Sequence, residues 1–408
     1  MLFNNVIILK YLSYLFFLLP LSLVTGPFLP DLIVSIVAFS FLIIVPRKKK
    51  FILLKDKKTI VFIIFWLYLT LRALFSQNLL ESFVPSFFYF RFGLFVLATI
   101  YFIENIPNFK KNFSNFLLYT ILFVSADAYF QIIFGYNFFG IENKISDRVS
   151  GLFGDEYILG SYLVRMLPIL IALKINSLEF NKKNTILFII SIALYNLLIF
   201  YTAERTAFIL NLIFFFLIVL TVKKIRFKIL TIILISLVTV IIAIKVDKNL
   251  YERMILQTYN EIYKGNKIRV FTEGHQDHLK SALKMFNDNK LFGKGVKNFR
   301  VLCKDSKYYE KITSCSTHPH NTYAQLLAET GLIGFSFVFL VLLFVSKEIF
   351  IFFIKSLKNQ EIDNQKLILN ILLFINLFPF SPSGSFFNNW LSIIYFLPLG
   401  FYISKLNK

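Results

Sequence analysis

The chain has only four histidines, and all of them lie in one polar stretch of an otherwise apolar sequence. They form two short pairs, His275-x-x-His278 and His318-x-His320. Imidazole is the side chain whose charge changes most readily near neutral pH, so it serves as a general base or as a metal ligand. This clustering predicts a reactive site in the polar stretch.

The second histidine pair leads directly into an apolar run of helical length. Thr322 and Gln325 match a capping box, with Thr322 as the N-cap and Gln325 at the third helical position. His320 and Asn321 would then stand at a helix N-terminus, where free N–H groups carry about half a positive charge. Such a position favours an anion such as a diphosphate and disfavours imidazolium. We therefore expect His320 to be a neutral base near pH 7.

Two other interpretations of these histidines stay open from the residues alone. A histidine at a helix start is often only a cap or a hydrogen-bonded surface residue. The i,i+3 pair His275 and His278, together with the second pair, also has the spacing of a zinc site. Four such ligands would leave no open position for catalysis, so we expect neither a metal nor a cofactor. His318, restricted to extended conformations by Pro319, is expected to be a positioning residue.

The polar stretch, residues 246–322, also contains the only two cysteines, Cys303 and Cys315. In an oxidising compartment a disulfide between them is expected, and it would hold the chain just before His318. A ring of that size would stabilise the fold by roughly 3 kcal/mol; two unpaired thiols are the alternative. The same stretch has the spacing of an amphipathic helix over 276–286 and of a turn over 291–296.

Membrane helices must position these residues. Of the 408 residues, 57% are hydrophobic and 52 are phenylalanine. Apolar runs of about 17–20 residues recur along the chain, each long enough to cross a hydrocarbon core of ~30 Å as a helix. Because the runs are continuous and do not alternate, they favour helices over barrel strands. We predict an all-α, polytopic membrane bundle of about twelve transmembrane helices, near residues 8–25, 30–46, 59–75, 84–103, 115–134, 157–175, 185–202, 206–222, 229–245, 323–346, 367–380 and 388–404.

The net charge of +21 follows the membrane topology and does not indicate a nucleic-acid partner. Lys and Arg gather in every second short gap between the apolar runs, which is the positive-inside pattern, and they would also attract anionic lipid. The pattern places both termini in the cytoplasm and one large loop, 246–322 between helices nine and ten, in the periplasm. We expect a single multi-pass domain over 1–408 in the cell inner membrane.

Several charged residues fall inside the predicted spans or near their ends. Arg91, Asp127 and Arg165 lie within apolar runs, where an unpaired charge is costly, so we expect them to face the bundle interior and to pair with one another. They could line a path for a membrane-borne substrate or form only a structural pair. Arg72 and Lys10 lie close enough to helix ends to reach the membrane surface.

The segment His320-Asn321, followed after nine residues by Gly331-x-x-Gly334, resembles the signature of the O-antigen ligase and Wzy-type polymerase family. Further segments resemble that family in the same order along roughly residues 120–390. They are Gln131-x-x-x-Gly135, Arg148-x-Ser150-Gly151-x-Phe153, the turn Ala203-Glu204-Arg205-Thr206, Phe292-Gly293-x-Gly295, and the late loop Pro382-Ser383-Gly384-Ser385. Each match alone is weak, but their order and the matching topology make the resemblance specific, with a core region over 120–345.

The resemblance implies a metal-independent, inverting glycosyltransferase with a GT-C-like helical fold. It would transfer a glycan from undecaprenyl diphosphate to an acceptor hydroxyl, either on lipid A-core, as a ligase, or on a growing polysaccharide, as a polymerase. We favour the ligase; a polysaccharide flippase is a remote alternative. His320 would be the base and Arg205 a catalytic cation, while Arg148, His318 and Asn321 would bind substrate, since Arg pairs with phosphate through two donors.

The chain departs from the family pattern at two places. Family members have an arginine about seven residues before the position of Ala282, where this chain has His275. Arg269, six residues earlier, is a candidate substitute, so both residues are kept as substrate-binding candidates. Glu204 stands where small residues are commoner, and we expect it to bind substrate or to orient Arg205 through an ion pair.

Overall fold

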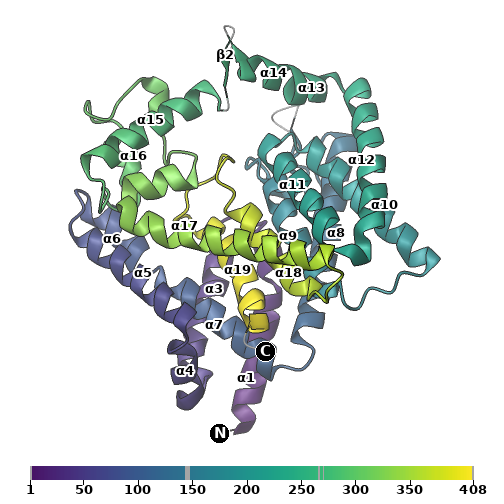
Figure 1. Cartoon of the computed structure of the whole chain (residues 1–408), viewed down its shortest axis with the longest axis horizontal. Coiled ribbons are helices and arrows are strands. Elements are labelled where there is room, and N and C mark those ends of the chain that lie inside the picture. Colours follow the sequence, from purple (N-terminus) through teal and green to yellow (C-terminus); the bar gives the residue numbers. More distant parts are fainter. Residues whose placement is uncertain (1, 143–147, 265–266, 270, 407–408) are drawn as a thin grey trace.

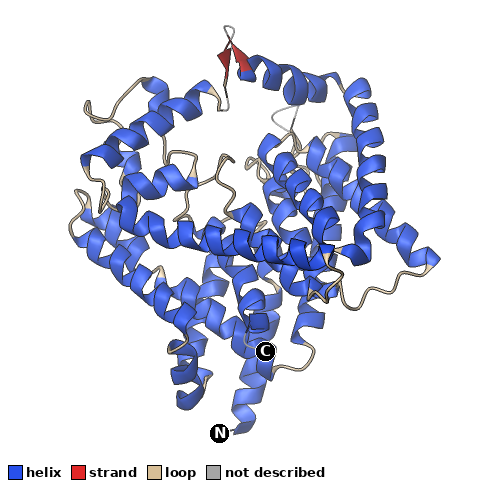
Figure 2. Cartoon of the chain, in the orientation of Figure 1, coloured by secondary structure: helices blue, strands red, loops and turns tan. Residues whose placement is uncertain are grey.

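The computed structural model of the chain describes residues 2–142, 148–264, 267–269 and 271–406. Almost every described element is a helix (Figure 2), as the composition predicts. The first twelve helices are α1 (Leu2–Phe17), α2 (Leu19–Ser22), α3 (Phe28–Ile44), α4 (Arg47–Leu54), α5 (Lys57–Leu74), α6 (Leu79–Phe87), α7 (Phe90–Asn105), α8 (Phe109–Phe134), α9 (Leu159–Lys174), α10 (Lys182–Tyr201), α11 (Arg205–Thr221) and α12 (Arg226–Val246). The last three are α17 (Thr322–Leu357), α18 (Asn364–Asn376) and α19 (Asn389–Leu406).

Each of the twelve predicted helices has a counterpart, but the number of clear membrane spans is smaller than predicted. In the described residues, five helices are long and apolar enough to cross a membrane, or six if α3 and α4, bent by 119°, count as one span. Others fail on length, because α11 and α18 have only 17 and 13 residues. The chain is a multi-pass helical membrane protein: all twelve predicted segments are helical, but only five or six of the described helices are clear spans.

The helices bury an aromatic core and leave apolar side chains on the outside. Phe16 of α1 packs against Phe95, Phe109 and Phe113 with ring centres 5.2–5.4 Å apart, and α7 packs against both α3 and α19 (Figure 1). By contrast, only 17% of the most apolar window of Lys223–Val246 is buried. Its exposed apolar side chains are the surface expected of a helix in contact with lipid.

The polar segment, which we define as residues 247–321 between α12 and α17, folds into short helices and one hairpin. It contains α13 (Lys248–Tyr251), a π-helical turn (Glu252–Leu256), α14 (Gln257–Ile262), β1 (Tyr263–Lys264), β2 (Lys267–Ile268), α15 (Glu273–Asp288) and α16 (Phe299–Leu302). In Figure 1 the chain passes from α12 through α13, α14 and the hairpin to α15 on the opposite side of the view. The amphipathic helix predicted over 276–286 is confirmed, because α15 buries Ala282 and Met285 and exposes its other face.

The two glycine motifs of the chain meet where the polar segment joins α17. Gly331 interrupts α17 with a left-handed φ of 62°, which frees carbonyl groups of the preceding turn. The backbone N–H groups of Lys294 and Gly295 donate to the carbonyls of Ala328 and Glu329 at 2.9 and 2.8 Å. A side chain on Gly331 would place its Cβ 2.3 Å from the carbonyl oxygen of Leu291. This main-chain contact, which we call the glycine junction, needs glycine because the two backbones touch.

Candidate active site

All four histidines lie together in the structure, although they come from two elements. His275 and His278 lie on α15, while His318 and His320 lie in the turn before α17. Between ring centres, His320 is 4.1 Å from His318, 5.1 Å from His278 and 5.4 Å from His275. We call this group the imidazole cluster; it makes the two sequence pairs one site.

His318 is fixed in one orientation by hydrogen bonds from both ring nitrogens. Its Nε2 lies 3.1 Å from the carbonyl oxygen of Ser383, which can only accept, so Nε2 carries the proton and donates it. Its Nδ1 then accepts from the hydroxyl of Thr317 at 2.8 Å. Burial lowers the pKa of His318 to about 4. With both nitrogens engaged, His318 is suited to positioning and not to proton transfer.

The ring nitrogens of His320 have no hydrogen-bond partner within the described residues, and Nδ1 of His278 is likewise buried without one. Burial, and then the charges of the three other imidazoles, lower the pKa of its ring to about 3. Its backbone is left-handed, with φ 55°, and its carbonyl accepts from the N–H of Ser383 at 3.0 Å. Residues other than glycine adopt this conformation at a cost, and such residues gather at functional sites.

The N-cap of α17 is Asn321, and the prediction of Thr322 was wrong by one residue. The Asn321 side chain accepts from the N–H groups of Tyr323 and Ala324 at 3.0 Å each, and its amide donates to the carbonyl of Pro379 at 2.9 Å. Asn caps a helix at least as well as Thr, which explains the shift. The predicted capping partner Gln325 instead donates to Ser385 at 2.9 Å. Asn321 is therefore engaged in structure through both the oxygen and the nitrogen of its amide.

Cys303 and Cys315 are joined by a disulfide, with Cα atoms 5.1 Å apart. Cys303 directly follows α16, and Cys315 lies three residues before His318. The cross-link therefore attaches α16 to the segment that carries His318 and His320.

Arg205 begins α11 and is bound to the polar segment. Its guanidinium forms an ion pair with Glu261 of α14 and donates to the carbonyl of Arg253 at 3.0 Å and to Gln257 at 3.3 Å. The expected ion pair between Arg205 and Glu204 is not formed. Arg205 therefore holds α14 over the end of α11.

Glu204 caps α9 instead of pairing with Arg205. Its carboxylate accepts from the N–H groups of Gly160 and Ser161 at 2.6 and 3.2 Å and from the Ser161 hydroxyl at 2.7 Å. The free N–H groups at a helix N-terminus stabilise a carboxylate, which explains why Glu204 binds the start of α9 and not Arg205. Burial raises the pKa of Glu204, while these bonds and the charge of Arg148 act against that rise. Arg148 also donates to the carbonyl of Tyr157 at 2.9 Å.

Glu261 connects Arg205 with the imidazole cluster. Burial lowers the pKa of His275, and the carboxylate of Glu261 acts in the opposite direction, so this carboxylate lies near the His275 ring. Arg205 and His275 thus share Glu261 as a neighbour. Arg269, the other candidate for the missing family arginine, lies 3.7 Å from the carboxylate of Glu273 at the start of α15.

The charged residues predicted to pair inside the membrane do not pair with one another. Arg91 binds Asp31 at 2.8 Å and Asn389 at 3.0 Å. Asp127 accepts from the backbone N–H of Phe138 at 2.8 Å, and Arg165 donates to the carbonyl of Ser161 at 2.8 Å. Arg165 is bound one helical turn away, whereas Arg91 is bound by side chains from distant parts of the chain. Asp127 Oδ2 and Arg165 Nε are buried without a hydrogen bond within the described residues. The predicted Asp–Arg pair among the three is wrong.

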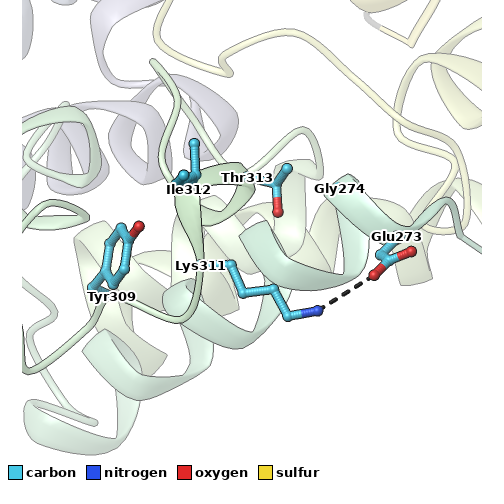
Figure 3. Close-up of a pocket in the computed structure, with 6 residues that line it drawn as sticks. All are labelled: Glu273, Gly274, Tyr309, Lys311, Ile312 and Thr313. Carbon is cyan, nitrogen blue, oxygen red and sulfur yellow. Dashed lines mark hydrogen bonds and ion pairs between the residues drawn. The ribbon is translucent and has the colours of Figure 1, made fainter.

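Within the described residues, the imidazole cluster coincides neither with a metal-binding group of side chains nor with the pocket drawn in Figure 3. Among the residues that the structure describes, no group of three or more His, Cys, Asp or Glu side chains could hold a metal ion. Figure 3 shows a pocket near the start of α15, where Lys311 pairs with Glu273 at 3.3 Å. None of the predicted site residues lines this pocket, so it is separate from the candidate site.

Sequence reasoning missed the residues that hold the site in place. Ser383 binds His318 through its carbonyl and His320 through its N–H. Arg72 donates to the carbonyls of Gly293 and Phe292 at 2.6 and 3.0 Å. Tyr68, one helical turn earlier, donates to the carbonyl of Thr330 at 2.5 Å. The available signal was the i,i+4 spacing of Tyr68 and Arg72, which puts both on one face of α5.

The comparison with known proteins adds a family to this geometry. Residues 186–339 match the Wzy_C family model, described as O-Antigen ligase. This region runs from α10 into α17 and includes Arg205 and the whole imidazole cluster. No curated protein sequence matches the chain.

The membrane helices and the matched region together describe a multi-pass helical membrane protein, part of which is similar to proteins of the O-antigen ligase and polymerase type. More particularly, the chain carries a Wzy_C O-antigen ligase domain over residues 186–339. The resemblance inferred from the sequence motifs is thereby confirmed.

Proposed function

We propose that this protein is an O-antigen ligase that transfers a glycan from undecaprenyl diphosphate to a hydroxyl group of lipid A-core, with His320 as the general base. The observation that carries the proposal is the state of His320. Its ring is neutral, its nitrogens are not hydrogen-bonded within the described residues, and it stands at the start of α17 inside the matched domain. A neutral imidazole beside a helix N-terminus can take a proton from a hydroxyl while an anion binds nearby.

In the proposed reaction the acceptor oxygen forms a bond to the anomeric carbon while the bond from that carbon to the diphosphate oxygen breaks. The bonding electrons leave with the diphosphate, and the acceptor proton passes to His320. Attack from the side opposite the leaving group inverts the anomeric centre. A diphosphate is stable as an anion, so no strong general acid and no metal are needed to release it.

A ring with a pKa of about 3 is a weak base, but binding of the substrate would raise this pKa. The pKa of His320 is low because of burial and three neighbouring imidazoles. An arriving diphosphate adds negative charge, which stabilises imidazolium and raises the pKa toward the range where proton transfer is efficient. The base would therefore gain strength only when the donor is bound.

Arg205 and Arg148 are the proposed diphosphate ligands at this stage. Arg205 is paired with Glu261, so it would exchange this carboxylate for the diphosphate when the donor binds. Glu204, placed on the N-terminus of α9, would position Arg205 through the turn that they share. We further propose that the polar segment faces the periplasm, that both termini are cytoplasmic, and that residues 1–408 form one membrane domain with its reaction core over 120–345.

The test of the base compares His320→Asn with His320→Ala. Asparagine tolerates the left-handed backbone that His320 adopts, whereas alanine does not, at a cost of about 1–2 kcal/mol. We expect both variants to lose transfer at least a hundredfold while lipid-linked donor accumulates, and only His320→Ala to unfold at a lower temperature. Normal transfer by His320→Asn would refute the role of base.

The polymerase is the alternative within the same family, and a deletion strain separates the two. Loss of a ligase leaves bare lipid A-core and polymer of normal length on the lipid carrier. Loss of a polymerase instead leaves single repeats on the core. The gel pattern of lipopolysaccharide from the deletion strain would decide between them.

A further inference from the structure

The chain lacks the family arginine on α15, and the structure offers a different cation beside the imidazole cluster. His275 stands at the arginine position, and Arg269 is near Glu273. Arg300 lies in α16, which is attached at both ends to the site. At one end the N–H of Phe299 donates to Glu329 of α17 at 3.2 Å, and at the other Cys303 is bonded to Cys315.

Arg300 is half-buried and has no carboxylate partner among the described residues. Its Nε is buried without a hydrogen bond. Lys297, one turn before it, is also half-buried and is not ion-paired within the described part of the chain. The charge of Arg300 contributes to the low pKa of His318, and the charges of Arg300 and Lys297 act on each other.

The other buried or ordered cations of the polar segment contrast with this pair. Lysines of the described part of this segment with a carboxylate within ion-pair distance include Lys280, Lys284, Lys294, Lys307 and Lys311. Lys290 and Lys304 are exposed to solvent. The carboxylate of Glu329 acts on both cations, although neither forms an ion pair with it within the described residues. Two half-buried cations that share one buried carboxylate leave an excess of positive charge, which is unfavourable away from water and indicates a place for an anion.

We propose that Arg300, with Lys297 beside it, supplies the second cation for the donor diphosphate, from the segment after the glycine junction instead of from α15. The inference rests on the proposed function, because the anion it assigns is the diphosphate of the lipid-linked donor. Asn298, between the two cations, is fully buried and neither polar atom of its side chain has a partner within the described residues. The segment thus holds unpartnered polar groups together with an excess of positive charge, and guanidinium is the group best matched to phosphate oxygens.

The test uses the full-length protein and undecaprenyl diphosphate without sugar as the probe. We expect Arg300→Gln to weaken its binding about 10- to 100-fold and to raise the KM for the donor, since a charged hydrogen bond is lost. Arg300→Lys should recover part of the affinity. Undecaprenyl monophosphate should respond less, because it lacks the second phosphate. The matched control is Lys304→Ala, an exposed cation on the same loop, which should stay within twofold of wild type.

The outcomes separate this inference from the proposed function. If wild-type protein binds no undecaprenyl diphosphate and transfers no glycan, the proposed function fails and the inference fails with it. If wild type is active and Arg300→Gln binds the diphosphate equally well, only the inference is overturned. It is also overturned if Arg300→Gln loses both lipids equally and unfolds at a lower temperature, because Arg300 would then serve only the fold.

Discussion

The pKa of a histidine depends on its surroundings, and in this protein the four histidines are one another's neighbours. Burial lowers the pKa of each member of the imidazole cluster from its ordinary value near 6.5. Mutual repulsion adds to this, because a proton on one ring disfavours a proton on the next. At neutral pH the cluster is therefore uncharged, which suits a base and leaves the site ready for an anion.

The lowered pKa values make a prediction about pH. Between about pH 6.5 and pH 4 the imidazoles are protonated in the unfolded chain but not in the folded cluster. The free energy of unfolding therefore falls as pH falls through this window. Between pH 7.5 and pH 5.0 the unfolding temperature should drop more for wild type than for His278→Gln, which removes one imidazole with a lowered pKa. An equal drop in both proteins would show that the cluster is charged when folded.

A second residue-scale prediction concerns the pair of Arg205 and Glu261. Glu261→Gln releases Arg205 from its carboxylate, so a diphosphate no longer has to displace it. We expect the KM for the donor to stay equal or to fall a few-fold, while Arg205→Ala raises it about tenfold or more. Glu310→Gln, which removes the pair with Lys284 elsewhere in the polar segment, is the matched control. A donor KM that rises in Glu261→Gln would show that the pair itself is needed.

At the scale of elements, the glycine junction fixes where the polar segment meets α17. Gly331→Ala should destabilise the protein by more than about 1–2 kcal/mol, because it adds a clash with Leu291 to the cost of a left-handed φ. Gly274→Ala is the control, since nothing lies within 4 Å of its Cβ position. Alanine there should be neutral or stabilising by less than about 1 kcal/mol. Thermal unfolding of both variants measures the difference, and equal effects would contradict the junction.

The disulfide gives a prediction for the same segment. Reduction, or Cys303→Ser with Cys315→Ser, removes the link between α16 and the histidine turn, at a cost of roughly 3 kcal/mol. We expect faster protease cleavage within the polar segment and weaker donor binding after reduction. The double variant should no longer respond to reductant. Cleavage that is insensitive to reductant in wild type would show that the link carries no stability.

At the scale of the whole molecule, the sequence predicted the helices better than it predicted their partners. The length of the apolar runs was enough to place each of the twelve predicted helices on a helix of the structure, since helix formation in lipid is set by composition. Tertiary packing decides which charged side chains form ion pairs. The pairs of Arg91 with Asp31 and of Arg205 with Glu261 therefore could not be predicted from sequence spacing. The motifs located His320 and its turn, whereas Ser383 and Arg300 are close to it only through the fold and the disulfide.

The proposed orientation of the molecule is also testable. Reporter fusions after Lys304, in the polar segment, should be active as periplasmic enzymes, and fusions after Leu406 should be active as cytoplasmic enzymes. The reason is the alternation of basic gaps along the chain. The reverse pattern would place the imidazole cluster on the cytoplasmic side and would remove the proposed donor from its reach.

The glycine junction has a consequence for how such enzymes can be re-engineered. Its contacts are made by main-chain atoms, with Tyr68 and Arg72 binding carbonyl groups and not side chains. Carbonyls and N–H groups are the same in every protein, so at the junction the membrane part recognises the shape of the segment and not its composition. A related enzyme could therefore donate its whole polar segment to this protein, provided that the donated segment keeps Gly293 and Gly295 to meet Gly331 of α17 and Glu261 to pair with Arg205.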